Sequence, residues 1–168
     1  GSQKLLEDRG VKLNLDLPGV GENLQDHLQV RSVYKVKNTV TLNQRANSLA
    51  GKALMGLEYF LFKTGPLTMP PSQLGAFAKS DPSQSSANIE WHVQPLSLEK
   101  FGDPLHTFNA ITPSVCNLRP SSRGHVRIKS SNWHEYPSIT MNYLSTEDDR
   151  RVAIDGLRFT RRIMAAKA

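Results

Sequence analysis

Leu17-Pro-Gly-Val-Gly-Glu-Asn-Leu-Gln-Asp-His27 is the most informative stretch of this 168-residue sequence. It imitates half of a dinucleotide-binding loop, because Gly19 and Gly21 follow a short apolar alternation as the first glycines of such a loop follow a strand. Leu24 stands where the third glycine would be, and Pro18 precedes the first. The pattern therefore favours a tight glycine turn at the end of a strand over a phosphate-binding loop.

Two further segments extend the argument. They are Leu118-Arg-Pro-Ser-Ser-Arg-Gly-His-Val-Arg-Ile128 and Pro137-Ser-Ile-Thr-Met-Asn-Tyr-Leu-Ser145. Together with Asp16–His27, they resemble in order and spacing the glucose–methanol–choline (GMC) flavoprotein oxidoreductases, especially the choline dehydrogenase-like alcohol dehydrogenases. The resemblance spans nearly the whole chain.

The resemblance also implies what is absent. GMC enzymes are much longer, begin with a G-x-G-x-x-G unit that binds FAD, and end near a catalytic histidine. Neither feature occurs in this sequence. We therefore expect a central fragment that is inactive alone, with no catalytic residue of its own. Residues 1–27 would form a short helix, strand and glycine turn at the edge of the flavin domain, and residues 28–168 a substrate-side domain with a C-terminal helix.

Composition fits one modest globular domain. The net charge is +6 and the pI is near 9.6, but the basic residues are scattered or gathered on the C-terminal helix, where a solvated face is usual. The pattern does not favour nucleic acid as a partner. The single cysteine, the lack of an apolar run of membrane-spanning length and the lack of a visible signal peptide favour a cytoplasmic location. Membrane association of the complete enzyme is left open.

Hydrophobic periodicity predicts an α+β fold with a mainly antiparallel sheet backed by helices, because strands and helices do not alternate regularly. The resemblance implies the same fold, that of a GMC substrate domain. The predicted helices are 3–9, 41–65 and one starting at Ser145. The predicted strands are 11–15, 28–36, 74–78, 89–94, 108–114, 125–129 and 138–141.

The strand Ile89-Glu-Trp-His-Val-Gln94 carries the best candidates for a substrate pocket. Alternation places Glu90, His92 and Gln94 on one face. A carboxylate and an imidazole on one face could hold an alcohol or a cationic group. The segment also resembles the family strand that runs past the active site. A solvated polar face is the equally weighted alternative.

Asn117 is a further candidate for the pocket. Choline-oxidising relatives often carry a histidine close to this position, and an amide cannot act as an acid or base near neutral pH. The difference argues against choline itself as the substrate. No cofactor-binding residue is assigned; the weaker candidates Asn23, Asp26 and His27 lie in the glycine turn. No metal site is expected, because the histidines show no metal-like spacing.

Two functions of different classes follow. The first is the substrate-side part of an FAD-dependent alcohol dehydrogenase, which oxidises a primary alcohol to an aldehyde by hydride transfer to the flavin. FAD would be bound by the missing FAD-binding domain and not retained by this chain. The alternative is a non-catalytic binding or interaction module with a basic surface. In either case an exposed apolar surface would favour self-association.

Overall fold

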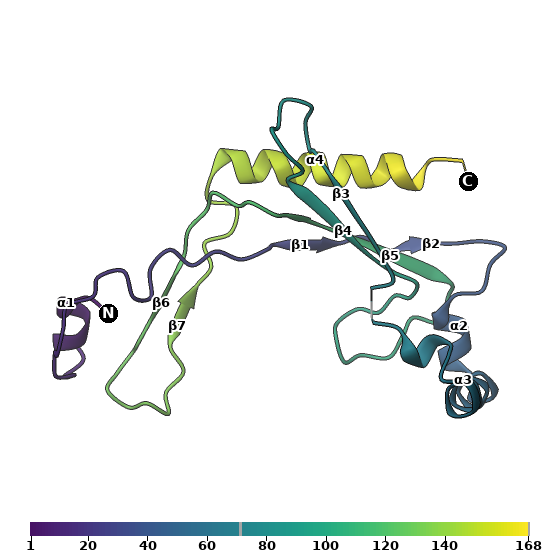
Figure 1. Ribbon diagram of the computed structural model, residues 1–168, viewed down its shortest axis with the longest axis horizontal. Helices are drawn as coiled ribbons and strands as arrows, with labels where there is room; N and C mark the ends of the chain where they lie inside the picture. The colour runs from purple at the N-terminus through teal and green to yellow at the C-terminus, as the bar shows by residue number, and fades with distance from the viewer. Residues whose placement is uncertain (71, 168) are drawn as a thin grey trace. The chain divides into compact units, whose positions relative to one another are not determined.

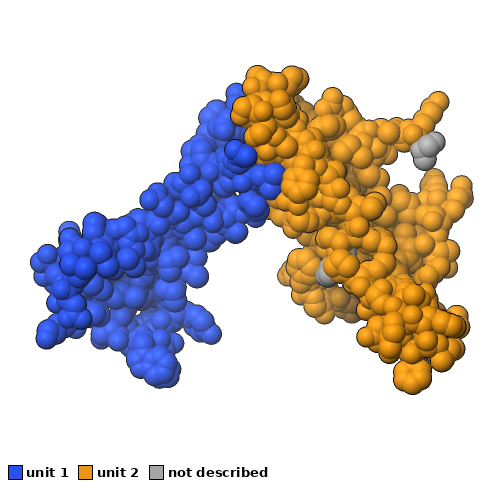
Figure 2. Space-filling model, in the orientation of Figure 1, with its two compact units in different colours: residues 1–28, 117–154 blue, residues 29–116, 155–168 orange. Residues whose placement is uncertain are grey.

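The computed structural model describes residues 1–70 and 72–167. Two compact units divide the chain: unit 1 contains residues 1–28 and 117–154, and unit 2 contains residues 29–116 and 155–168 (Figure 2). The division predicted from the sequence, with residues 1–27 at the edge of a flavin domain and 28–168 as a substrate-side domain, stays a prediction.

An antiparallel sheet organises unit 2 (Figure 1). Its described strands are β1 (Gln29–Arg31), β2 (Tyr34–Lys35), β3 (Leu74–Ala78), β4 (Ile89–Gln94) and β5 (Ala110–Asn117), whose last residue belongs to unit 1. The strand order is β1-β5-β4-β3, and β2 pairs with another part of β5. The pairings Gln29↔Cys116 and Gly75↔His92 fix the register on either side of the central strands. The predicted α+β class with an antiparallel sheet is confirmed.

The helix α4 (Glu147–Met164) covers one face of this sheet with its second half. Trp91 donates its indole N–H to Thr160 at 2.7 Å, and a side chain at Gly156 would meet Val115 at 3.0 Å. Ile89, like Trp91, is almost completely buried. Because side chains alternate along a strand, the neighbours of Trp91 and Val115 in the chain lie on the opposite face. That face stays free of α4 and carries polar groups.

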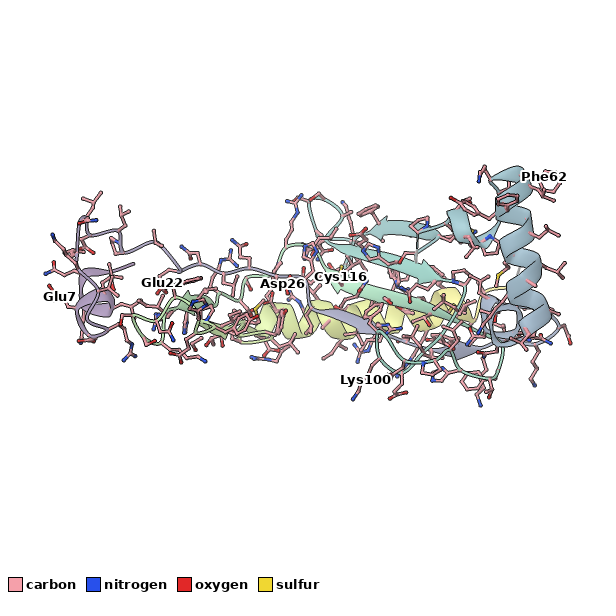
Figure 3. The ribbon with its side chains drawn as sticks, turned by 90° about the horizontal axis from the view of Figure 1, so that it is seen from below. Glu7, Glu22, Asp26, Phe62, Lys100 and Cys116 are labelled. Atoms are coloured by element: carbon pink, nitrogen blue, oxygen red, sulfur yellow. The ribbon has the colours of Figure 1, made fainter. Side chains whose placement is uncertain are left out.

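Two further helices, α2 (Leu42–Asn47) and α3 (Leu49–Phe62), and the short 3-10 helix η1 (Pro66–Thr68) complete unit 2. The fully buried side chain of Asn43 anchors α2: its amide donates to the backbone oxygens of Ser97 and His106, at 2.9 Å each. In contrast, α3 buries only Met55 and exposes most of its large apolar side chains, among them Phe60 at 75% and the terminal Phe62, which Figure 3 labels.

Unit 1 contains α1 (Gln3–Glu7), the antiparallel pair β6 (His125–Arg127) and β7 (Ser138–Thr140), and the first part of α4. In α1, the Ser2 hydroxyl accepts a hydrogen bond from the Leu5 amide, which is the usual role of serine at a helix N-cap. The β6–β7 pair lies beside the segment before β1: Leu24 and Gly124 form an isolated antiparallel bridge.

Three sequence-based expectations for local structure are wrong. Residues 11–15 form no strand, because the Val11 amide bonds back to Leu6 and the stretch has no ladder partner. The strand expected over 28–36 is interrupted between β1 and β2, where Ser32 faces Pro113, which has no N–H to donate to the ladder. The helix expected over 41–65 breaks at Ser48, whose extended backbone and side chain cap α3.

The N-cap of the last helix, predicted at Ser145, lies one residue later, at Thr146. Thr146, not Ser145, caps α4, since its hydroxyl accepts from the Asp149 amide at 3.3 Å. The Ser145 amide instead donates to the Ser122 hydroxyl. The buried side of α4 is confirmed at Val152 and Thr160.

Candidate functional site

The three sequence segments that carry the resemblance meet in unit 1. Gly21 has a φ of +85°, and its carbonyl accepts from the Val126 amide at 2.7 Å. A Cβ at this glycine would lie 2.2 Å from the Val126 carbonyl oxygen. The glycine turn is therefore packed against β6. That close approach, not a phosphate, is what requires the glycine.

Asp149 ties the Arg-Pro-Ser-Ser-Arg-Gly segment to α4. Its buried carboxylate accepts from the amides of Ser121 and Ser122 at 2.8 and 2.9 Å and from the Asn117 side chain at 3.2 Å. Burial would raise the pKa of Asp149, but these hydrogen bonds from Ser122 and Ser121 outweigh it and lower the pKa below its usual value. Asn117, a predicted pocket residue, thus lies in unit 1 with its amide bonded to this carboxylate.

Two of the weaker cofactor candidates, Asp26 and His27, have protein partners in unit 1. The Tyr143 hydroxyl donates to Asp26, which lowers the pKa of the carboxylate and raises that of the phenol. The His27 ring lies 3.2 Å from the Leu118 carbonyl oxygen, and Asn23 adopts a left-handed backbone with φ of 60°. Asp26 and His27 also line a pocket of about 240 Å³. Their contacts give them a bracing role, and any cofactor contact stays a prediction.

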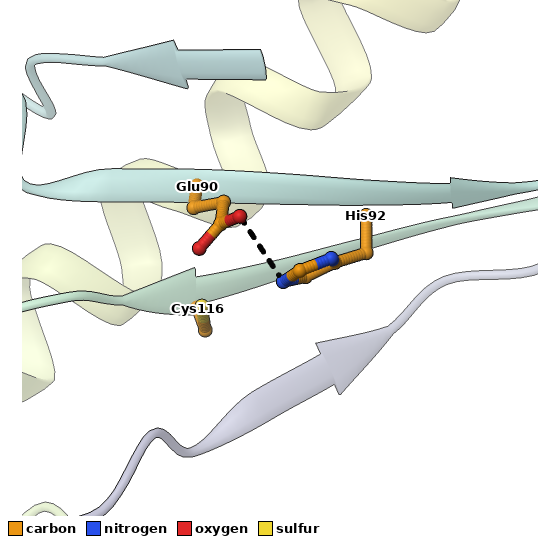
Figure 4. A group of neighbouring side chains, drawn as sticks. All are labelled: Glu90, His92 and Cys116. Carbon is orange, nitrogen blue, oxygen red and sulfur yellow. Dashed lines mark ion pairs between the residues drawn. The ribbon is translucent and has the colours of Figure 1, made fainter. Parts of the chain in front are cut away.

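A group of three chemically active side chains lies on the open face of the sheet in unit 2. The Glu90 Oε1 and His92 Nε2 atoms are 3.3 Å apart, an ion pair when the imidazole is protonated. The sulfur of Cys116, on the adjacent strand β5, lies within 4.8 Å of a ligand atom of each (Figure 4). The three residues belong to two strands that follow one another in the chain and are neighbours in the sheet.

Cys116 is the most deeply buried member of this group, with 3% of its surface exposed. Burial and the negative charge of Glu90 raise the pKa of its thiol above the usual value. The Cys116 thiol is therefore neutral at physiological pH and is not activated as a nucleophile.

A pocket of about 330 Å³ opens beside these residues, lined by His92 and Gln94 together with Gln29, Pro70, Ser72 and Phe101. Gln94 is only 6% exposed, and its Oε1 has no hydrogen-bond partner among the described residues. The Arg31 guanidinium stacks on Phe101 at 4.7 Å and also has buried nitrogens without a partner in this part of the structure. The pocket therefore combines an imidazole, amides and an aromatic ring, the mixture expected of a small-molecule site.

Sequence reasoning placed three of these side chains and missed one. Alternation along one strand put Glu90, His92 and Gln94 on one face. In the structure Glu90 pairs with His92, and His92 and Gln94 line the same pocket. Cys116 was predicted only to be a buried thiol, because the pattern of one strand does not tell which residue of another strand lies beside it. The signal that could have found it is the β4–β5 pairing.

Residues 120–168 match the family model of the GMC oxidoreductases. The oxygen-dependent choline dehydrogenase of Photobacterium profundum is 36% identical over all 168 residues, and that of Escherichia coli is 37% identical over 164 residues, or 98% of the chain. The chain is therefore similar to the GMC oxidoreductases. It spans 29% of the length of each of these curated relatives.

Solved structures give the same fold. Pyridoxine 4-oxidase from Mesorbium loti aligns with 99% of this chain and 29% of its own, at a TM-score of 0.75 and 22% identity. A formate oxidase aligns with 95% of this chain and 32% of its own, at a TM-score of 0.81 and 19% identity. Across the described residues, no helix is both long and apolar enough to span a membrane.

Proposed function

We propose that this chain is the substrate-side part of an FAD-dependent alcohol dehydrogenase of the choline dehydrogenase-like kind, which oxidises a primary alcohol to an aldehyde. The identity to two choline dehydrogenases supports the reaction class. The observation that carries the assignment to the substrate side is the polar sheet face, where Glu90 and His92 pair beside a pocket of about 330 Å³.

The residues of this face can bind and orient an alcohol. The Glu90 carboxylate can accept a hydrogen bond from a hydroxyl or attract a cationic substituent, and the His92 imidazole can donate or accept. Gln94 supplies an amide oxygen that has no partner in the described structure. Held between such groups, a small alcohol would lose much of its freedom to rotate, which is how positioning lowers a reaction barrier.

FAD is assigned no binding residues here. The glycine turn gives no sign of a phosphate loop, because Gly21 is taken up by its close packing against the Val126 carbonyl. We infer that other parts of the complete enzyme bind the flavin, which would accept the hydride from the alcohol carbon. The chain's own contribution is the wall of the pocket.

The exposed helix α3 supports the view that further parts of the enzyme pack on unit 2. Its apolar side chains, including Leu49, Leu54, Phe60 and Phe62, are mostly exposed to solvent. Exposed apolar surface on this scale is uncommon on a monomer. The curated relatives have more than enough additional length to cover it.

The test uses the complete enzyme with the substitutions Glu90→Gln and His92→Asn. Loss of a hydrogen bond to a charged group costs about 1.5–3 kcal/mol, so kcat/KM for primary alcohols should fall roughly 10- to 100-fold. Glu99→Gln is the matched control, because Glu99 is 80% exposed and lies outside the pocket lining. Comparing a quaternary ammonium alcohol with its neutral tert-butyl isostere then shows whether Glu90 recognises a cation or the hydroxyl.

Two results would contradict the proposal separately. A complete protein that binds no FAD, or oxidises no alcohol, would refute the activity. An active flavoprotein in which both variants stay within twofold of wild type would refute only the placement of the substrate on this sheet face.

A further inference from the structure

Three kinds of ligand atom converge on the open sheet face of unit 2: a carboxylate oxygen from Glu90, an imidazole nitrogen from His92 and the sulfur of Cys116. All of them lie within 4.8 Å of one another. These are the three ligand types that zinc accepts in proteins, and a mixture of sulfur and imidazole nitrogen selects it over hard cations such as magnesium.

The geometry of the pair is already close to that of a metal site. With bonds of about 2.0–2.1 Å to oxygen and nitrogen, a tetrahedral zinc ion holds those two ligands about 3.3 Å apart. The Glu90 Oε1 to His92 Nε2 distance is 3.3 Å. A zinc–sulfur bond of about 2.3 Å needs the sulfur about 3.6 Å from the other two ligands. A side-chain shift of roughly 1 Å therefore completes the set.

Charge and access also fit. Binding replaces the thiol proton, which leaves to solvent, so that one thiolate and one carboxylate balance the two positive charges of the ion. A neutral set suits a position where Cys116 is buried and Glu90 is partly buried. The pocket beside His92 gives water a path to the fourth position, as in zinc sites with three protein ligands.

We propose that Glu90, His92 and Cys116 form a binding site for one Zn²⁺ ion, with water as the fourth ligand. This inference stands on the three side chains and does not depend on the oxidoreductase function. One consequence does rest on that function: a bound ion uses a Glu90 oxygen and a His92 nitrogen, and so it would compete with an alcohol for these two atoms.

The experiment loads the complete protein with ZnCl₂, removes free metal by gel filtration, and measures the metal by mass spectrometry and X-ray absorption at the zinc edge. We expect one zinc per chain, one sulfur neighbour at about 2.3 Å and nitrogen or oxygen neighbours at about 2.0–2.1 Å. Competition with a chromogenic chelator gives the dissociation constant. Each of Cys116→Ser, His92→Asn and Glu90→Gln should raise it at least tenfold.

Glu99→Gln is again the matched control, because Glu99 also lies 3.8 Å from a histidine, His106, but outside the group of three ligand residues, so it should leave zinc affinity unchanged. A zinc shell without sulfur in the wild-type protein would overturn the proposal, and that measurement needs no variant to fold. Unchanged affinity in Cys116→Ser, with an unchanged circular dichroism spectrum, would also overturn it. Zinc binding without inhibition of alcohol oxidation would leave the metal site standing and refute the shared position with the substrate.

Discussion

The hydrogen bond between Trp91 and Thr160 is expected to hold α4 against one face of the sheet, and its removal tests how much this contact stabilises the fold. The Trp91 indole N–H donates to the Thr160 hydroxyl at 2.7 Å, and this hydroxyl donates to the Gly156 carbonyl at 2.8 Å. Thr160 is 1% exposed, so no water can replace its hydroxyl without rearrangement. The bond joins β4 to α4, two elements far apart in the sequence.

Thr160→Val removes the hydroxyl at almost constant volume. Threonine and valine have similar helix propensities, so the helix itself should be little affected. The indole N–H is then buried without a partner, which costs about 1–3 kcal/mol. The added methyl recovers part of this in an apolar site. We expect the free energy of unfolding to fall by about 1–2 kcal/mol.

Urea unfolding followed by far-ultraviolet circular dichroism measures this change. Thr160→Ser, which keeps the hydroxyl, is the control for lost packing. The same substitution in a Trp91→Phe background supplies a double-mutant cycle, because phenylalanine has no N–H to leave unpaired. An equal cost of Thr160→Val in both backgrounds would refute the view that this bond fixes the helix.

Two further predictions concern unit 1. Gly21→Ala should lower the melting temperature by several degrees, because the φ of Gly21 is +85° and the new Cβ would lie 2.2 Å from the Val126 carbonyl oxygen. Gly19 has open space around it, so Gly19→Ala should change the melting temperature little in the same scan. Equal effects of the two substitutions would refute the argument. The pKa of Asp149 is lower in the folded protein than its usual value of 3.8, so the ionised carboxylate stabilises the fold at pH values above 3.8. This stabilisation is lost as the pH falls through the folded-state pKa. Asp149→Asn should therefore have a lower free energy of unfolding than wild type at neutral pH, and this difference should narrow below about pH 4. A difference that does not change with pH in urea titrations would contradict the assignment.

Much of the fold could be predicted from local pattern. The strands 74–78 and 89–94 were predicted with the bounds that the structure shows. The first is a short apolar run, and the second alternates apolar and polar residues with period two. The strand expected over 11–15 has the same alternation and fails. A strand forms only where a neighbour offers a ladder, and the amide of Val11 bonds locally to α1 instead.

The helices show a similar limit. Periodicity predicted apolar positions over 41–65, but it could not tell that Ser48 would cap a second helix rather than continue the first. It also gave no sign that Phe60 would be exposed, because burial depends on what packs against a helix. The spacing of residues along one helix carries no information about that partner.

The sequence by itself indicated the family resemblance, the class of fold and the shared face of Glu90 and His92, since these follow from motifs, from hydrophobic periodicity and from alternation along one strand. Only the tertiary structure decided that the glycine turn packs against β6 and that Cys116 lies beside the Glu90–His92 pair. The physical reason is that strand register joins residues through hydrogen bonds between distant segments. Local propensity does not encode which segments will meet.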